Sequence, residues 1–239
     1  MPDVYWRAGL DSRERGIFRQ HRRLRIETAS SVDENRMITL FDFRPSQNAW
    51  KVRQLLWHLG LPYQSEFLST SDSAGERVKP VPVDHWGPAP VVQLEDGRVL
   101  SESNTILWYL SDNTAYRPDD PFTQAKVFQW LSFEADYIQT TVGSLHFWAL
   151  TGNLCPRSTD LVDDKRATAN RALGILNREL ASRPFIASDT YSIADIAIFA
   201  YAHLAAAAGI STDHLPDFEA WLTRVRAQQG FLAPTHPLC

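Results

Sequence analysis

Hydrophobic and β-prone residues near the start of the chain form two strand patterns with a helical pattern between them. The run Ile38–Phe43 is apolar and β-prone, and the breaker residues after it end the predicted strand. Apolar side chains then recur at helical spacing until Gly60, which predicts the end of a helix. A weaker strand pattern covers Tyr63–Leu68. The segment therefore predicts a strand-helix-strand unit.

A second group of elements is predicted after a loop that is rich in serine, proline and charge. Two short β-prone runs, over residues 90–94 and 98–100, flank the dipeptide Asp96-Gly97, which is favoured in tight hairpins. From Glu102 onward, apolar residues return at helical spacing. The loop is therefore followed by a hairpin and then a helix.

Strand patterns end near residue 118, and only helical patterns follow. Helices are predicted over residues 121–150, 160–181, 192–208 and 216–228. The pattern predicts an α+β domain over residues 37–114, followed by an all-α domain over residues 119–234.

The first 36 residues differ from the rest because they show little apolar periodicity. They hold eight arginines, which suggests a basic tail, but six acidic residues dilute that charge and argue against a transit peptide. Met37 directly precedes the first convincing strand. We expect residues 1–36 to be a poorly ordered or mis-started leader.

Composition and charge exclude several classes of protein. The net charge of -4 and the pI near 6.0 give no electrostatic footprint for nucleic acid or an anionic membrane surface. Two cysteines, Cys155 and Cys239, form neither a disulfide framework nor a metal motif, so we expect no metal. No run of 18 apolar residues occurs. These features indicate a protein of the reducing cytoplasm that binds neither nucleic acid nor membrane.

Three junctions between predicted elements carry residues suited to ligand binding. Each has a simpler structural interpretation: a serine caps the first helix, a trans proline begins a strand, and glutamate and serine cap a later helix. The residues are Ser46 and Asn48 in the first turn, Ala89 and Pro90 before the third strand, and Glu102 and Ser103 after the hairpin.

Together, these motifs and the order of elements resemble the cytosolic glutathione transferase superfamily, in its bacterial type with a serine active-site turn. The resemblance covers about residues 38–234. It implies a thioredoxin-like domain that binds glutathione, an all-helical domain that holds the second substrate, and a homodimer.

The resemblance implies that Ser46 is the catalytic residue. Glutathione's thiol has a cysteine-like pKa of about 8.5 and is mostly protonated at neutral pH. A hydroxyl that donates to sulfur, helped by the positive end of the following helix, would favour the thiolate. Asn48 would supply a second donor or hold the turn.

The other two motifs would bind the tripeptide. A cis bond at Pro90 would let the main chain of Ala89 pair with the cysteinyl part. Glu102 would meet the α-ammonium of the γ-glutamyl group, and Ser103 its α-carboxylate. The residues just before Gly87 depart from the family's pattern, so the resemblance does not say which residues bind the glycyl carboxylate of glutathione. Arg77 and Lys79 are candidate substitutes for that contact.

The helical domain carries a structural motif and two candidates for the second-substrate pocket. Ser192 and Asp195 match a capping box, which we interpret as structural. Tyr137 and Tyr201 are placed where an apolar pocket between the domains is expected, although aromatic residues pack cores more often than they line sites.

The function expected from these features is attack by the glutathione thiolate on a small electrophile. Reduction of a disulfide or peroxide with glutathione remains open, and so does a glutathione-binding or regulatory module without catalysis. A thioredoxin-type oxidoreductase is disfavoured because the chain lacks a Cys-x-x-Cys motif.

Overall fold

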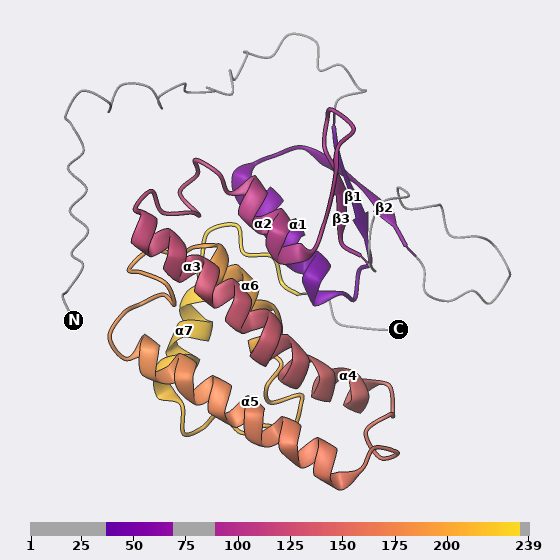
Figure 1. The fold of residues 1–239 in the computed structure, drawn as a ribbon, viewed down its shortest axis with the longest axis vertical. Coiled ribbons are helices and arrows are strands. Elements are labelled where there is room, and N and C mark those ends of the chain that lie inside the picture. Colours follow the sequence, from indigo (N-terminus) through magenta and orange to yellow (C-terminus); the bar gives the residue numbers. More distant parts are fainter. Residues whose placement is uncertain (1–36, 69–88, 235–239) are drawn as a thin grey trace, which may run out of the picture. The chain divides into compact units, whose positions relative to one another are not determined.

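The computed structural model describes residues 37–68 and 89–234, drawn in colour in Figure 1, and all of them belong to one unit that spans Asn35–Cys239. Several expectations fall outside the described residues. These are the leader over residues 1–36, Arg77, Lys79 and Cys239.

The N-terminal domain is thioredoxin-like, with a four-stranded mixed sheet in the order β2-β1-β3-β4. Strand β1 runs parallel to β2 and antiparallel to β3, and β3 and β4 form an antiparallel pair. The elements in chain order are β1 (Ile38–Asp42), α1 (Gln47–Leu59), β2 (Tyr63–Phe67), β3 (Val91–Gln93), β4 (Val99–Ser101) and α2 (Ser103–Leu110).

The buried faces of this domain explain why these segments form. Every residue of β1 is buried, as is typical of a central strand covered on both faces. Leu40 lies in one buried hydrophobic cluster with Val52 and Leu56 of α1 and with Ile106 of α2, so both helices share a core with the sheet. Helix α1 ends at Gly60, whose φ of 62° is the left-handed conformation that glycine adopts without a Cβ clash.

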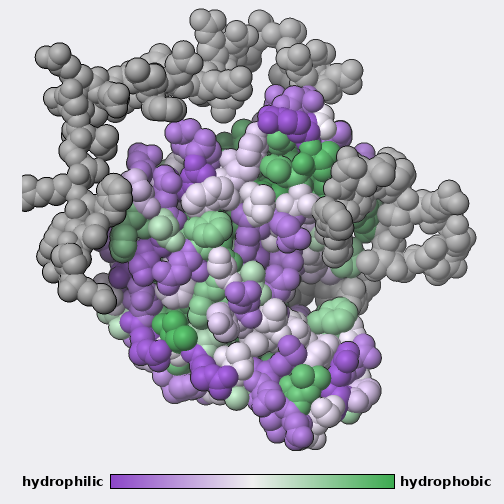
Figure 2. Space-filling model, viewed as in Figure 1, coloured by the Kyte–Doolittle hydropathy of each residue, from purple (hydrophilic) through white to green (hydrophobic). Residues whose placement is uncertain are grey.

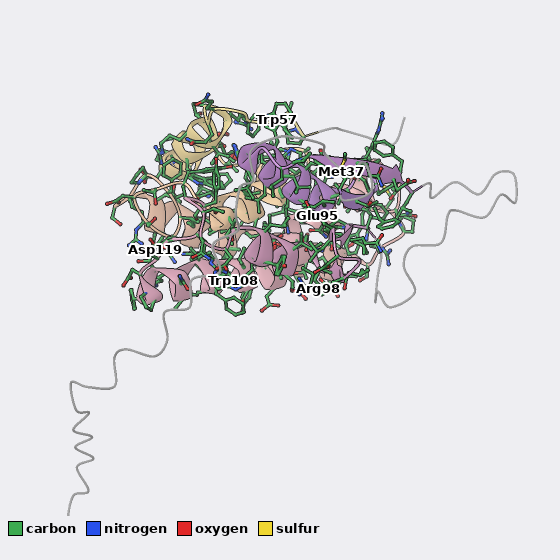
Figure 3. The ribbon with its side chains drawn as sticks, turned by 90° about the horizontal axis from the view of Figure 1, so that it is seen from above. Met37, Trp57, Glu95, Arg98, Trp108 and Asp119 are labelled. Atoms are coloured by element: carbon green, nitrogen blue, oxygen red, sulfur yellow. The ribbon has the colours of Figure 1, made fainter. Side chains whose placement is uncertain are left out.

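The second domain is all helical and begins after a junction marked in Figure 3 by Trp108 on α2 and Asp119 just before α3. Helix α6 is almost entirely buried and packs against α1, α3 and η1. The elements are α3 (Pro121–Phe133), η1 (Glu134–Gly143), α4 (Ser144–Leu150), α5 (Thr159–Leu180), α6 (Ile193–Ala202) and α7 (Pro216–Arg226).

Two helices differ from the prediction. The segment predicted as one helix over 121–150 is continuous, but its middle part, η1, is a π-helix, which apolar spacing does not distinguish from an α-helix. The helix predicted over 192–208 stops at Ala202 and continues as turns to Gly209, whose φ is 76°. Alanines keep the apolar pattern through those turns, so periodicity alone extended the helix too far.

The two domains share one hydrophobic core. Trp50 of α1 lies in the same cluster as the buried residues of α6, with its ring centroid 5.5 Å from that of Phe199. Its indole N–H donates to the Leu232 carbonyl at 2.9 Å, so the end of the described chain also contacts α1. On the face drawn in Figure 2, hydrophobic residues are interspersed with hydrophilic ones. The largest cluster of buried apolar residues contains Trp50, Leu55 and Leu107 of the first domain together with residues of the helical domain.

Candidate functional site

The turn between β1 and α1 is held at both ends. The Ser46 N–H donates to the Phe43 carbonyl at 2.8 Å. Arg53 of α1 forms an ion pair with the buried Asp42 and donates to the Arg44 carbonyl at 3.1 Å. The backbone that carries Ser46 is therefore fixed to the strand before it and to the helix after it.

Ser46 caps helix α1. Its Oγ accepts a hydrogen bond from the Ala49 N–H at 3.2 Å, and the residue is half-buried. The plain structural interpretation of this serine is thus correct. In that bond Oγ is the acceptor, so the hydroxyl hydrogen remains available to a ligand atom at the positive end of the helix. Capping and thiolate stabilisation are compatible.

The peptide bond between Ala89 and Pro90 is cis, as the family resemblance implies and not the trans bond of the simpler interpretation. Ala89 is buried and leads directly into β3. The first residue of β3, Val91, pairs with Phe41 of β1 and with Ser101 of β4. The register therefore brings the turn after β1, the cis peptide and the start of α2 to one edge of the sheet.

The start of α2 has an unusual backbone at Glu102. Its φ is 68°, which is uncommon for a residue with a Cβ, and its carbonyl accepts from the Ile106 N–H at 2.9 Å. The Glu102 side chain is exposed, whereas Ser103 beside it is buried. Backbone strain of this kind concentrates at ligand-binding sites. The motif thus presents a carboxylate outward and a hydroxyl inward.

A buried lysine next to this motif was missed by the sequence analysis. The Lys51 side chain has no exposed surface, and its Nζ lies 2.8 Å from Oε2 of Glu134, which is also fully buried. The same nitrogen donates to Ser103 Oγ at 3.4 Å and to Asn104 Oδ1 at 3.3 Å. Burial lowers the pKa of Lys51, and the Glu134 carboxylate opposes that shift.

The hydrogen bonds of these residues continue in both directions. Ser103 Oγ donates to Asn48 Oδ1 at 3.3 Å, and Asn104 Nδ2 donates to the Leu131 carbonyl and to Glu134 Oε2, both at 2.9 Å. The network thus joins α1, the start of α2 and the helical domain. We call Asn48, Lys51, Ser103, Asn104 and Glu134 the interdomain polar network.

One sequence signal could have found the lysine. Lys51 precedes Leu55 by four residues, which places both on the same face of α1. Lysine is almost never fully buried without a partner, so its place on an apolar face predicts a buried carboxylate. The sequence gives no direct sign that this carboxylate is Glu134, because the two residues are 83 positions apart.

The structure gives the two tyrosines predicted for the second-substrate pocket different surroundings. Tyr201 packs against Gly143, and the Lys51 Nζ lies 5.4 Å from the centre of its ring. Burial, followed by the charge of Glu134, raises the pKa of Tyr201. Tyr137 is exposed on η1 and packs against Phe133 at a ring-centroid distance of 5.1 Å. Their role in substrate binding stays a prediction.

The capping box at the start of α6 is confirmed. Asp195 is fully buried, and its carboxylate accepts from the Ser192 N–H at 3.0 Å and from the Ile186 N–H at 2.9 Å. The Trp221 indole N–H donates to the same carboxylate at 2.9 Å. Asp195 therefore ties together three segments of the helical domain, in keeping with a structural role.

Within residues 37–68 and 89–234, no group of three or more histidine, cysteine, aspartate or glutamate residues is arranged to hold a metal ion. Across the same residues, no helix is long and apolar enough to span a bilayer. The one cysteine that the structure describes, Cys155, is exposed and not in a disulfide.

Comparison with known proteins covers both domains. The family model described as glutathione S-transferase, N-terminal domain, matches residues 45–113, and its C-terminal counterpart matches residues 132–229. Elongation factor 1-gamma of Carassius auratus is 32% identical over 112 residues, which are 47% of this chain and 25% of that protein. The match thus spans a quarter of that relative's length.

Solved structures agree with the family match. A glutathione S-transferase from Pseudomonas fluorescens Pf-5 superposes with a TM-score of 0.77 at 28% identity, over 84% of this chain and all of that one. A second family member from the same organism, solved with two glutathione molecules bound, has a TM-score of 0.70 at 24% identity, over 83% of this chain and 92% of its own. The chain belongs to the cytosolic glutathione S-transferase superfamily.

Proposed function

We propose that the protein is a glutathione transferase that activates the thiol of glutathione for attack on a small electrophile. The observation that carries this proposal is the register of the sheet, in which Val91 pairs with both Phe41 and Ser101. This register gathers Ser46, the cis Ala89–Pro90 peptide and the start of α2 at one edge. The structure of a relative with two glutathione molecules bound supports glutathione as the ligand.

The proposed mechanism assigns one task to each part of this edge. Glutathione lies extended, with its cysteinyl backbone paired to Ala89 and its γ-glutamyl group between Glu102 and Ser103. The Ser46 hydroxyl donates a hydrogen bond to the sulfur, which stabilises the thiolate and releases the thiol proton to solvent. The thiolate forms a carbon–sulfur bond with the electrophile, whose leaving group departs with the bonding electron pair.

The experiment is conjugation of glutathione to an aryl halide by the wild type and by Ser46→Ala. We expect kcat/KM to fall about 100-fold, the usual loss when one preorganised donor to a developing anion is removed. Ser158→Ala is the matched control, because Ser158 also caps a helix, with its Oγ accepting from the Leu161 N–H at 3.4 Å. That variant should lose a helix cap and keep its activity.

Equal losses in the two variants would contradict the proposal, since they would trace the effect to capping alone. A wild type that conjugates no aryl halide but reduces a small disulfide or peroxide with glutathione would favour the reductase alternative. Binding of glutathione without any turnover would favour a binding module. A binding module stays the second candidate because 112 residues of this chain resemble elongation factor 1-gamma, a protein that is not named as a transferase.

We also propose that the protein acts in the cytoplasm as a homodimer, as its family membership suggests. Light scattering on the purified full chain should give twice the mass of 27.1 kDa at micromolar concentration. A mass equal to that of a single chain throughout the concentration range would contradict the dimer.

A further inference from the structure

The Ser103 hydroxyl has a single hydrogen, and this hydrogen meets an acceptor inside the protein. Ser103 is buried, and its Oγ donates to Asn48 Oδ1 at 3.3 Å. From the other side, the same oxygen accepts from Lys51 Nζ at 3.4 Å, since an ammonium group can only donate. The hydroxyl hydrogen is therefore directed at Asn48 and not at a ligand.

This hydrogen bond fixes which way the Asn48 amide is turned. If the amide were turned over, Nδ2 would face the Ser103 oxygen, and the buried hydroxyl hydrogen would lose its acceptor, which costs free energy. The amide therefore keeps Oδ1 towards Ser103. Among the residues that the structure describes, none accepts a hydrogen bond from Asn48 Nδ2, and this atom keeps some surface open to solvent. Asn48 thus holds two N–H donors ready for a ligand.

We propose that Ser103 is a positioning residue, which orients the Asn48 amide so that Nδ2 donates a hydrogen bond to the sulfur of bound glutathione. The inference rests on the proposed function and deepens it. Asn48 lies in the first turn of α1, two residues after the N-cap Ser46, so both side chains belong to the same end of the helix. A donor that is already oriented favours the thiolate over the protonated thiol. Ser103 thereby acts on the thiol through Asn48.

The helical domain completes the chain of hydrogen bonds that orients Asn48. Lys51 is fully buried, and Glu134 Oε2, 2.8 Å from its Nζ, favours the charged form of the lysine. The ammonium donates to Ser103 Oγ, which polarises the hydroxyl and strengthens its own hydrogen bond to Asn48. Glu134 is the first residue of η1. The orientation of a group in the thiol-binding turn therefore depends on a carboxylate of the second domain.

The test is a double-mutant cycle on Ser103 and Asn48, followed by the pKa of the glutathione thiol in the complex. A pH titration of the thiolate absorbance measures this pKa on the full chain. Asn48→Ala should raise it by about 1 unit, the scale of one hydrogen bond to a charged group. Ser103→Ala should raise it by ~0.3 to 1 unit, because an amide free to take two orientations donates to sulfur for half of the time or less.

The effects of the two substitutions should not add. If Ser103 acts through Asn48, the thiol pKa in the double variant should equal that in Asn48→Ala alone. Ser103→Thr keeps a hydroxyl and should keep the wild-type thiol pKa. Ser111→Ala is the matched control, because Ser111 is a buried serine at the other end of α2 whose hydroxyl donates to the Trp108 carbonyl at 3.2 Å. This variant should also leave the thiol pKa unchanged.

A Ser103 hydroxyl that binds the γ-glutamyl carboxylate directly would give a different result. Ser103→Ala would then weaken glutathione binding in calorimetry without changing the thiol pKa, which would overturn the inference and leave the proposed function intact. An equal rise of the thiol pKa with and without Asn48 would also overturn the inference, because Ser103 would then act by another route. A wild type that does not bind glutathione would overturn both the inference and the proposed function.

Asn48→Asp decides the matter if Ser103→Ala does not fold, which thermal unfolding checks. The aspartate still accepts from Ser103 and places an oxygen where Nδ2 stands. It should raise the thiol pKa by more than Asn48→Ala does, because a like charge would then face the thiolate. A thiol pKa as low in Asn48→Asp as in the wild type would overturn the inference.

Discussion

At the scale of single residues, buried ionisable groups have the largest consequences in this protein. Asp195 has no exposed surface, and burial raises its pKa to about 6, although four hydrogen bonds from the backbone, Trp221 and Ser192 favour the charged form. The motif Ser192 to Asp195 could be predicted from sequence because a capping box is local. Its bond to Trp221, 26 residues away, could not.

Replacing Asp195 with asparagine should lower the free energy of unfolding by about 2–4 kcal/mol, since the amide group would face two buried donors that now meet a carboxylate oxygen. Chemical denaturation at neutral pH measures the change. Asp160→Asn, on the exposed first turn of α5, is the control and should change stability by less than about 0.5 kcal/mol. A loss no larger than that of the control would contradict the assigned role.

The same residue predicts a pH dependence. The pKa of Asp195 is raised from 3.8 to about 6 in the folded state, so the folded protein binds a proton that the unfolded chain has released. The part of its stabilisation that comes from this bound proton is therefore fully present below about pH 4 and is lost as the pH rises through 6, while the part that comes from its hydrogen bonds remains at neutral pH. The stability difference between wild type and Asp195→Asn should shrink from pH 4 to pH 7. A difference that grows over this range would show that the shift has the opposite sign.

At the scale of elements, the π-helix η1 brings Glu134 to the interdomain polar network and Gly143 to Tyr201. A Cβ on Gly143 would lie 2.8 Å from the Tyr201 ring, which is closer than real Cβ atoms approach their neighbours. The position of the Tyr201 ring therefore requires glycine at residue 143. Apolar spacing predicted a helix here, but the choice of π over α depends on tertiary contacts that spacing does not contain. The element was predictable and its geometry was not.

Gly143→Ala should push Tyr201 away from η1 and destabilise the protein by about 1–3 kcal/mol, the usual cost of overpacking. Gly174→Ala is the matched control, since the nearest atom to its Cβ is the end of Arg178 at 3.7 Å. In that open helical position alanine should stabilise by about 0.5–1 kcal/mol. Thermal unfolding compares the two variants, and a stable Gly143→Ala would show that Tyr201 moves without cost.

At the scale of the whole molecule, the two domains form one shared core and meet at one polar network. The order of strands and helices along the chain and the start of α2 could be predicted because each depends on neighbouring residues, and the cis Ala89–Pro90 peptide was implied by the family resemblance. The pairing of Lys51 with Glu134 could not, because it arises only when α1 and η1 pack together. The proposed glutathione site therefore depends partly on local motifs and partly on the contact between the domains.

The central claim is that Ser46 stabilises the thiolate of bound glutathione, and the most direct measurement is the pKa of that thiol in the complex. A pH titration followed by the ultraviolet absorbance of the thiolate gives it for the wild type and for Ser46→Ala. We predict a thiol pKa in the wild-type complex at least ~1 unit below its free value of about 8.5, and a return to about 8.5 in the variant. The same thiol pKa in both complexes would contradict the account.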